Sequence, residues 1–213
     1  MHIIGLSGVA GSGKDLCFEL LSKRLKCIKL SLADSLKSEV NKWTIPNYNI
    51  DCLSCCREDK NLIRPLLVNH AKIRRDETKG RYWIDQLSNK IKKIKKTDYD
   101  FGVITDIRYN DYEKDEIFWL KKELNGILIH ISQYSLENRL NHNGVKVFLK
   151  PFNEEEKRND PHLKRESDFQ IEWQFMDHDN SKQEIENFLL DSYIDPLIKN
   201  IKELTTDNKN HNV

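Results

Sequence analysis

The chain has 213 residues, and 32% of them are charged, but its 35 basic and 34 acidic side chains leave a formal net charge of only +1. A chain of this length is expected to form a single domain with a sizeable core. Its balanced charge excludes a general electrostatic attraction to nucleic acids or membrane surfaces, so any recognition of anions must be local. We therefore expect no nucleic-acid partner and no membrane partner.

The amino-terminal residues and the cysteines indicate the cellular compartment in which the protein is expected. The apolar run at residues 2–6 lacks the basic region, the longer apolar segment and the cleavage site of a secretory signal. No stretch of the sequence is long and apolar enough to span a bilayer. Five cysteines, an odd number, favour reduced thiols. These features predict a cytoplasmic location.

Hydrophobic periodicity predicts strands that alternate with helices along the chain. Strands are expected at residues 2–7, 27–32, 101–105, 126–131 and 173–176. Helices are expected at residues 14–25, 33–43, 58–75 with an interruption near Pro65, 80–96, 109–124, 133–140 and 181–204. Residues 44–57 predict a loop or an irregular insertion, and the polar tail from Thr205 is expected to be disordered. The alternation predicts an α/β fold, with helices on both faces of a parallel five-stranded sheet.

A glycine-rich motif follows the first expected strand. Residues 8–15 read GVAGSGKD, which fits the phosphate-loop pattern G-x-x-x-x-G-K followed by aspartate in place of serine or threonine. Glycines let consecutive backbone N–H groups turn toward phosphate oxygens, and Lys14 would reach the β and γ phosphates of ATP. A glycine-rich turn of purely structural purpose is the alternative. The residues expected to bind the nucleotide are Gly8, Val9, Ala10, Gly11, Ser12, Gly13, Lys14, Asp15 and Leu16.

Asp15 places a carboxylate beside the expected phosphates. Magnesium prefers oxygen ligands and keeps several waters, so Asp15 could hold Mg²⁺ directly or through water, with the ion lying between carboxylate and phosphate. A carboxylate that only stabilises the N-terminus of the helix is the alternative. The motif thus predicts ATP and Mg²⁺ as ligands.

Four more segments accompany the loop SGVAGSGKD at residues 7–15. They are LADSLK at 32–37, IRPLL at 63–67 with Arg74 and then YWI at 82–84, VITDIRYN at 103–110, and HDNSKQEI at 178–185. Together they resemble the deoxynucleoside monophosphate kinases of bacteriophages and large DNA viruses, a branch of the P-loop kinases. The resemblance implies a three-layer P-loop NTPase fold of the nucleoside monophosphate kinase type. It also implies nucleotide substrates, a homodimer and, for a viral protein, the host cytoplasm.

The resemblance divides the chain into functional parts. It implies a core at residues 1–43, 98–132 and 169–204, a helical acceptor-binding insertion at about 44–97, a lid at about 139–168 and a tail at 205–213. His178 and Asn180 would contact the nucleotide, although the family usually has asparagine and glycine there, and Gln133 stands where an arginine often follows the fourth strand. In the lid, Arg139 is the preferred catalytic residue, and a solvated charged surface is the alternative for the other basic side chains.

Asp106 and Arg108 follow the strand expected at 101–105, so they should lie at the carboxyl edge of the sheet, where open α/β folds bind ligands. Asp106 could hold magnesium through water or accept a hydrogen bond from a substrate. Arg108 could grip phosphate with its planar guanidinium, and an ordinary surface pair is the alternative. The predicted catalytic residues are Lys14, Asp106, Arg108 and Arg139, and the predicted metal ligands are Asp15 and Asp106.

The acceptor is expected to contact Asp34, Arg64, Arg74, Trp83 and Arg108. For Arg64 and Arg74, and for the neighbouring Arg75, the alternative is a solvated helix face. Trp83 could instead belong to the core.

An ATP-dependent kinase that converts deoxynucleoside monophosphates into diphosphates is the leading interpretation. Phosphomevalonate kinase of the animal type has a similar Ser-Gly-x-x-x-Ser-Gly-Lys-Asp loop, and a non-catalytic ATP-binding module is a third possibility. Cys52, Cys55 and Cys56 resemble half of a zinc site, but no second pair accompanies them, so we expect a variable loop there.

Overall fold

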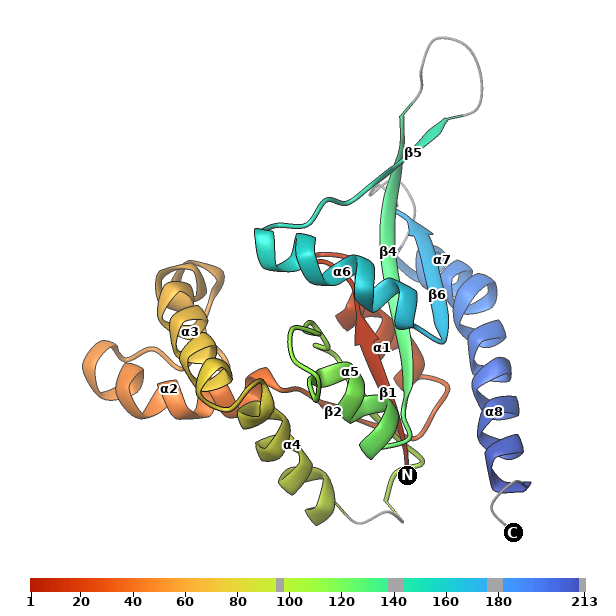
Figure 1. Cartoon of the computed structure of the whole chain (residues 1–213). Coiled ribbons are helices and arrows are strands. Elements are labelled where there is room, and N and C mark those ends of the chain that lie inside the picture. The colour runs from red at the N-terminus through yellow and green to blue at the C-terminus, as the bar shows by residue number, and fades with distance from the viewer. Residues whose placement is uncertain (95–97, 138–143, 176–181, 211–213) are drawn as a thin grey trace.

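A computed structural model describes residues 1–94, 98–137, 144–175 and 182–210 of the chain (Figure 1). Its centre is a six-stranded sheet in the order β2-β3-β1-β4-β5, with β6 also paired to β4. The strands are β1 (His2–Ser7), β2 (Cys27–Leu30), β3 (Phe101–Ile104), β4 (Ile127–Glu137), β5 (Val145–Phe148) and β6 (Phe169–Gln174). All pairings are parallel except the antiparallel pairing of β4 with β5.

Strand β1 lies in the middle of the parallel part, between β3 and β4. In its register, Ile4 stands opposite Val103 on one side and Ile127 on the other. Every residue of β1 after His2 is buried, and all of β3 is buried. This matches the near-continuous apolar composition of strands that are covered on both faces.

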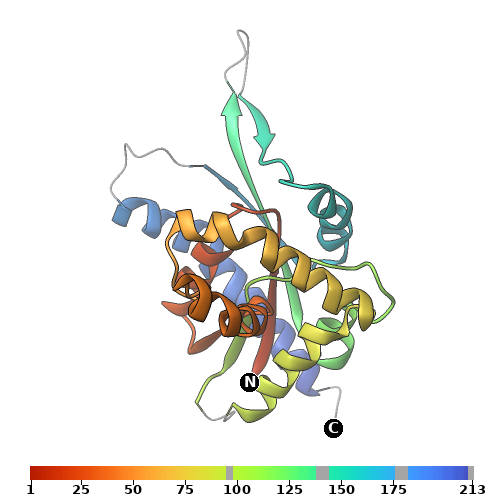
Figure 2. The same ribbon diagram turned by 90° about the vertical axis from the view of Figure 1, so that its left-hand side faces the viewer.

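Helices cover both faces of the sheet (Figures 1 and 2). They are α1 (Lys14–Ser22), α2 (Ala33–Tyr48), α3 (Arg57–Glu77), α4 (Arg81–Lys93), α5 (Glu116–Phe118), the π-helical turn η1 (Trp119–Glu123), α6 (Glu154–Glu166), α7 (Lys182–Leu189), the π-helical turn η2 (Leu190–Ile194) and α8 (Asp195–Asn210). On one face, α1, α7, η2 and α8 pack against Ile4 and Leu6. On the other face, α4, α5, η1 and Leu163 of α6 pack against Ile3 and Leu128. Successive side chains of each strand point to opposite faces of the sheet and therefore pack into two separate cores.

Helices α2, α3 and α4 form a helical unit that extends to one side of the sheet (Figure 1). Val40, Ile50, Cys52 and Ile63 make a small core of their own between α2, α3 and the loop that joins them. Within the insertion predicted for residues 44–97, α3 and α4 supply the expected helices, but α2 continues past its predicted end at residue 43. It runs through Pro46 to Tyr48, and the residue that caps it, Asn49, has a left-handed φ of 55°.

Helix α3 also continues through a proline, Pro65, where the sequence predicted an interruption. A proline inside a helix removes one backbone hydrogen bond and costs stability. In both helices, apolar residues on the buried side, such as Val40 and Ile63, offset that cost by packing in the small core.

The sheet corrects two sequence predictions. Residues 133–140 were expected to be helical, but β4 continues to Glu137 because Gln133 and Tyr134 pair with β6 and Tyr134 to Glu137 pair with β5. The sheet therefore has six strands and is not wholly parallel, since the region predicted as a lid contributes β5. Among its described residues, the same region also contributes α6, which crosses the carboxyl edge of the sheet (Figure 1).

Two other segments differ from the predicted helices and tail. The helix expected at 109–124 begins only at Glu116, because the Asp115 side chain accepts the Glu116 N–H and so starts the helix there. The tail expected to be disordered from Thr205 is helical as far as Asn210, as the continuation of α8. No helix in the described ranges combines the length and the apolar character that a membrane span requires.

Candidate active site

The glycine-rich loop connects β1 to α1, as the motif predicts, and three of its glycines need a positive φ. Gly8 has φ 129°, Gly11 has φ 83° and Gly13 has φ 92°. A Cβ on Gly8 would lie 2.2 Å from the carbonyl oxygen of Ile131, and one on Gly13 would lie 2.5 Å from Cζ2 of Trp173. These close approaches hold the loop against β4 and β6, and only glycine permits them.

Trp173 supports the loop from β6. Its ring is buried in the core, and its indole N–H donates to the carbonyl oxygen of Ser12 at 2.9 Å. Ser12 itself is fully buried, and its hydroxyl has no hydrogen-bond partner among the described atoms. The loop thus has a fixed backbone and one polar side chain that is free to bond.

Lys14 turns back over the loop. Its Nζ donates to the carbonyl oxygens of Gly8 at 2.6 Å and Val9 at 2.7 Å. Burial lowers the pKa of Lys14 to about 8, and the nearby charge of Arg108 lowers it further, against the opposing effect of Glu156. A bound anion would oppose both effects, so the amine is prepared for a negatively charged ligand.

The carboxylate of Glu156 connects Arg108 to the glycine-rich loop. Nη1 of Arg108 lies 3.3 Å from Oε1 of Glu156, on α6. The same carboxylate accepts the backbone N–H of Ala10, at 3.2 Å and 3.3 Å from its two oxygens. A small hollow at this place is lined by Gly8, Val9, Arg108, Glu156, Asp160 and Leu163. A loop N–H group and an arginine therefore already converge on one anionic group.

A buried histidine connects α6 to the sheet. His130 of β4 stands beside Ser7 of β1 in the register, and its Nε2 lies 3.0 Å from Oδ1 of Asp160. Ser132 lies 3.4 Å from the other ring nitrogen. Sequence reasoning missed His130, Glu156 and Asp160, because they belong to an apolar strand and to a charge-rich stretch in which no local pattern distinguishes them.

Asp106 lies at the carboxyl edge of the sheet, as predicted, but it serves the start of α2. Its Oδ2 accepts the Ser31 hydroxyl at 2.7 Å and the Ala33 N–H at 2.9 Å, and its Oδ1 accepts the Leu32 N–H at 2.9 Å. These bonds use most of the lone pairs of the carboxylate. These bonds do not favour direct coordination of magnesium by Asp106, and the predicted contact through water stays a prediction, while the position of Asp106 at the carboxyl edge of the sheet agrees with the sequence.

Asp15 is the accessible carboxylate of the loop. Its side chain is 75% exposed in the first turn of α1, and its Oδ1 lies 2.6 Å from Nζ of Lys29 on β2. The hydrogen bond from Lys29 lowers the pKa of Asp15 below its usual value. An exposed ion pair of this kind contributes little stability. Asp15 can therefore exchange the Lys29 ammonium for a metal cation with little loss of stability. Leu16 beside it is exposed.

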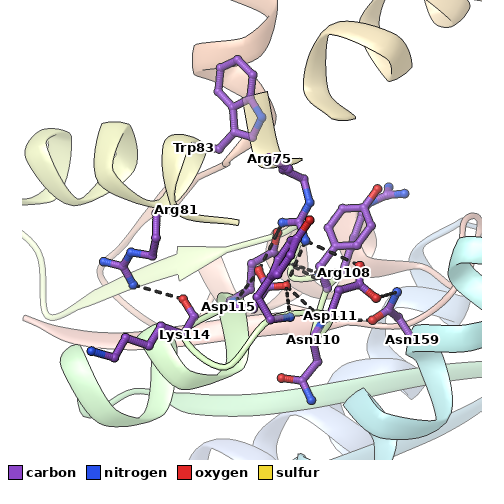
Figure 3. A network of polar contacts seen from close by, with 12 residues as sticks. Arg75, Arg81, Trp83, Arg108, Asn110, Asp111, Lys114, Asp115 and Asn159 are labelled. Carbon is purple, nitrogen blue, oxygen red and sulfur yellow. Dashed lines mark hydrogen bonds and ion pairs between the residues drawn. The ribbon is translucent and has the colours of Figure 1, made fainter. Parts of the chain in front are cut away.

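Arg75 on α3, for which a solvated helix face was the alternative, is buried and joins a polar network (Figure 3). It is 6% exposed, and its guanidinium contacts Asp115 at 2.9 Å and Glu116 at 3.3 Å and stacks on Tyr109 with 3.8 Å to the ring centre. Oε2 of Glu116 accepts the N–H groups of Arg108 at 2.6 Å and Tyr109 at 3.0 Å. Burial raises the pKa of Glu116, while Arg75 opposes that rise. The network fixes the backbone that carries Arg108.

The same segment is tied to α6. The Asn110 N–H donates to Oδ1 of Asn159 at 2.9 Å, and Asp111 accepts bonds from Asn159 and Arg158. Figure 3 shows Asn159 pointing from α6 toward Asn110 and Asp111. Helix α3, the segment after β3 and helix α6 are therefore joined in one polar network.

The other predicted acceptor residues are scattered over the helical unit. Asp34 pairs with Lys90 at 3.5 Å, and Arg74 stacks on Tyr82 with 4.8 Å to the ring centre. Arg64 is exposed on α3 and faces the Phe152 ring, which lies just before α6, at 5.7 Å. Arg64 is linked to the loop through Phe152, because the Phe152 N–H donates to Glu156, which also accepts the Ala10 N–H.

Trp83 belongs to the core, as its alternative interpretation had it. The residue is 5% exposed, and its indole N–H donates to the carbonyl oxygen of Ala71 at 3.3 Å. The substrate contact predicted for Trp83 is therefore not favoured.

Arg139, His178 and Asn180 lie outside the described residues. Cys52 packs in the small core beside Thr44, and no group of three or more His, Cys, Asp or Glu residues in the described part of the chain is arranged to hold a metal ion.

Comparisons with models of known protein families and with curated proteins found no match.

The contact between Gly13 and Trp173 predicts a difference between two alanine substitutions. Gly13→Ala should destabilise the protein by about 2 kcal/mol or more, from the positive φ together with the clash against the indole ring. Gly11→Ala is the matched control, because its φ is also positive but its Cβ would meet only Leu149 Cδ2 at 3.3 Å. Urea unfolding measures both free energies, and equal losses would show that Trp173 does not hold the loop.

The two neighbouring arginines of α3 also predict different stabilities. Arg75→Ala leaves Asp115 and Glu116 buried without their cation, which should cost about 3–5 kcal/mol of unfolding free energy. Arg74→Ala removes a half-buried stacking contact and should cost about 1 kcal/mol. Urea unfolding midpoints compare the two variants. A loss for Arg75→Ala as small as that for Arg74→Ala would contradict the role of the network.

Proposed function

We propose that this protein is an ATP-dependent kinase that transfers a phosphoryl group to a deoxynucleoside monophosphate. The observation that carries the proposal is the convergence of the Ala10 N–H and the Arg108 guanidinium on one carboxylate, beside the buried amine of Lys14. A site that gathers these donors around a single anion suits the phosphates of a nucleotide.

Each side chain has a role in such a transfer. Phosphoryl transfer spreads negative charge over the moving group, and positioned cations stabilise that charge. The loop N–H groups and Lys14 would bind the β and γ phosphates of ATP, and Arg108 would lie against the group in transfer. Gly8 and Gly13 leave room for the loop to approach its ligand and its supporting strands closely.

Magnesium fits the loop through one protein carboxylate. Mg²⁺ bound with ATP typically takes one or two carboxylates together with phosphate oxygens and water, and there it neutralises developing charge. Asp15 is the carboxylate at the loop with a largely exposed side chain. Asp106 would act differently, by fixing the start of α2 at the edge of the site.

The acceptor would lie between the helical unit and α6. Arg64 on α3 faces Phe152, next to the hollow that contains Arg108 and Glu156, and its exposed guanidinium is available for the acceptor phosphate. Arg74 lies on the same helix, half-buried against Tyr82. The loop and its neighbouring charges would bind phosphate groups whatever the rest of the acceptor molecule is. Phosphomevalonate should therefore be tested as a competing acceptor.

Turnover tests the assignment directly. ATP and Mg²⁺ with dTMP or dGMP should give ADP and the nucleoside diphosphate, and Lys14→Ala and Arg108→Ala should each lower the rate by at least about a hundredfold. Arg165→Ala, which removes an exposed arginine paired with Glu166, should keep the rate of the native chain. Phosphorylation of phosphomevalonate alone would replace the proposed acceptor. Tight ATP binding without phosphorylation of any acceptor would indicate a non-catalytic module.

The lowered pKa of Lys14 predicts that the protein takes up protons when nucleotide binds. With a pKa of about 8, the amine of the free protein is about half protonated at pH 8, and bound phosphate should restore the full charge. Binding of Mg²⁺–ATP at pH 8 should then take up as much as about half a proton, and clearly less at pH 7. Isothermal calorimetry in buffers of different ionisation enthalpy measures this uptake. Binding at pH 8 without uptake would contradict the environment described for Lys14.

A further inference from the structure

We infer that Glu156 is an internal competitor of the nucleotide, a side chain whose carboxylate occupies a phosphate position of the loop and must leave when a triphosphate binds. The inference rests on the proposed function, since it takes the ligand of the loop to be a nucleoside triphosphate. It adds a residue that sets the affinity of the site and that belongs to neither the loop nor the acceptor unit.

The contacts of Glu156 are those expected of a bound phosphate oxygen. It accepts the Ala10 N–H, which lies 146 residues away in the chain, and it pairs with Arg108 at 3.3 Å. It also accepts the N–H of Phe152 at 3.0 Å. Its side chain is 11% exposed, so the carboxylate is enclosed between the loop and α6.

A purely local role does not explain these contacts. Glu156 lies in the first turn of α6, where a glutamate can bond backbone N–H groups and stabilise the helix N-terminus. That role needs only the Phe152 contact, and the side chain of Asn153 already accepts the Glu156 N–H at 2.8 Å. The neighbouring Glu154 lies in the same turn with an 88% exposed side chain and reaches no part of the loop.

The rest of α6 would remain in place when Glu156 leaves. His130 holds Asp160, the Asn110 N–H holds Asn159, and Leu163 packs in the core. Displacement therefore requires the Glu156 side chain to turn away, or the first turn of α6 to lift. Either movement frees Arg108 and the Ala10 N–H together for the incoming phosphates.

The test compares two substitutions that remove the same charge from the same helical turn. Glu156→Gln keeps the size of the side chain but cannot form the charge-assisted pair with Arg108, so Mg²⁺–ATP and inorganic triphosphate should bind about tenfold more tightly. Glu154→Gln should bind both probes as the native chain does. Glu156→Asp keeps the charge but shortens the reach to the loop, so its affinity should lie between those of the native chain and Glu156→Gln. Calorimetry measures the affinities, and urea unfolding checks that each variant is folded.

The outcomes separate this inference from the proposed function. If neither the native chain nor any variant binds ATP or triphosphate, the nucleotide site itself is wrong. If the native chain binds ATP and neither Glu156→Gln nor Glu156→Asp binds more tightly, the competitor role is overturned and Glu156 serves only the fold. An equal gain for Glu154→Gln would also overturn it, because the effect would then be one of general charge.

Discussion

The glycine-rich loop concentrates positive electrostatic potential at one point, and the surrounding structure is arranged to balance it. Backbone N–H groups, the N-terminus of α1, the buried amine of Lys14 and the guanidinium of Arg108 meet there. Such a concentration is unfavourable without an anion, because like charges at short distance repel and burial removes the water that would screen them. The carboxylate of Glu156, on α6, supplies that anion by accepting the Ala10 N–H and pairing with Arg108.

The arrangement depends on a second network that positions Arg108. A buried arginine of α3, Arg75, neutralises Asp115 and Glu116, and Glu116 then accepts the N–H groups at the start of the segment that carries Arg108. The same segment bonds to Asn159 of α6. Movement of α3 or α6 would therefore change the position of Arg108. The two helices and the segment that carries Arg108 share hydrogen bonds, and the loss of these bonds leaves buried charges unpaired.

Much of the fold follows from local patterns in the sequence. The apolar run of β1, the glycines after it and the helical spacing of α1 predict the first strand, loop and helix, because backbone conformation there is set by neighbouring residues. The extension of β4 to Glu137 could not be predicted in this way, since its polar residues form a strand only when β5 and β6 pair with them. Pro46 and Pro65 likewise suggest helix ends, and packing in the small core overrides them.

By itself, the sequence determined that a glycine-rich loop connects a buried strand to a helix, and that Lys14, Asp15, Asp106 and Arg108 follow the carboxyl ends of two parallel strands. Only the tertiary structure decided which charges meet there. It pairs Arg108 with Glu156, bonds Asp106 to the start of α2, and buries Arg75 against Asp115 and Glu116. The physical reason is that electrostatic partners are chosen by distance in space and by burial, and residues more than a hundred positions apart leave no local pattern of their pairing.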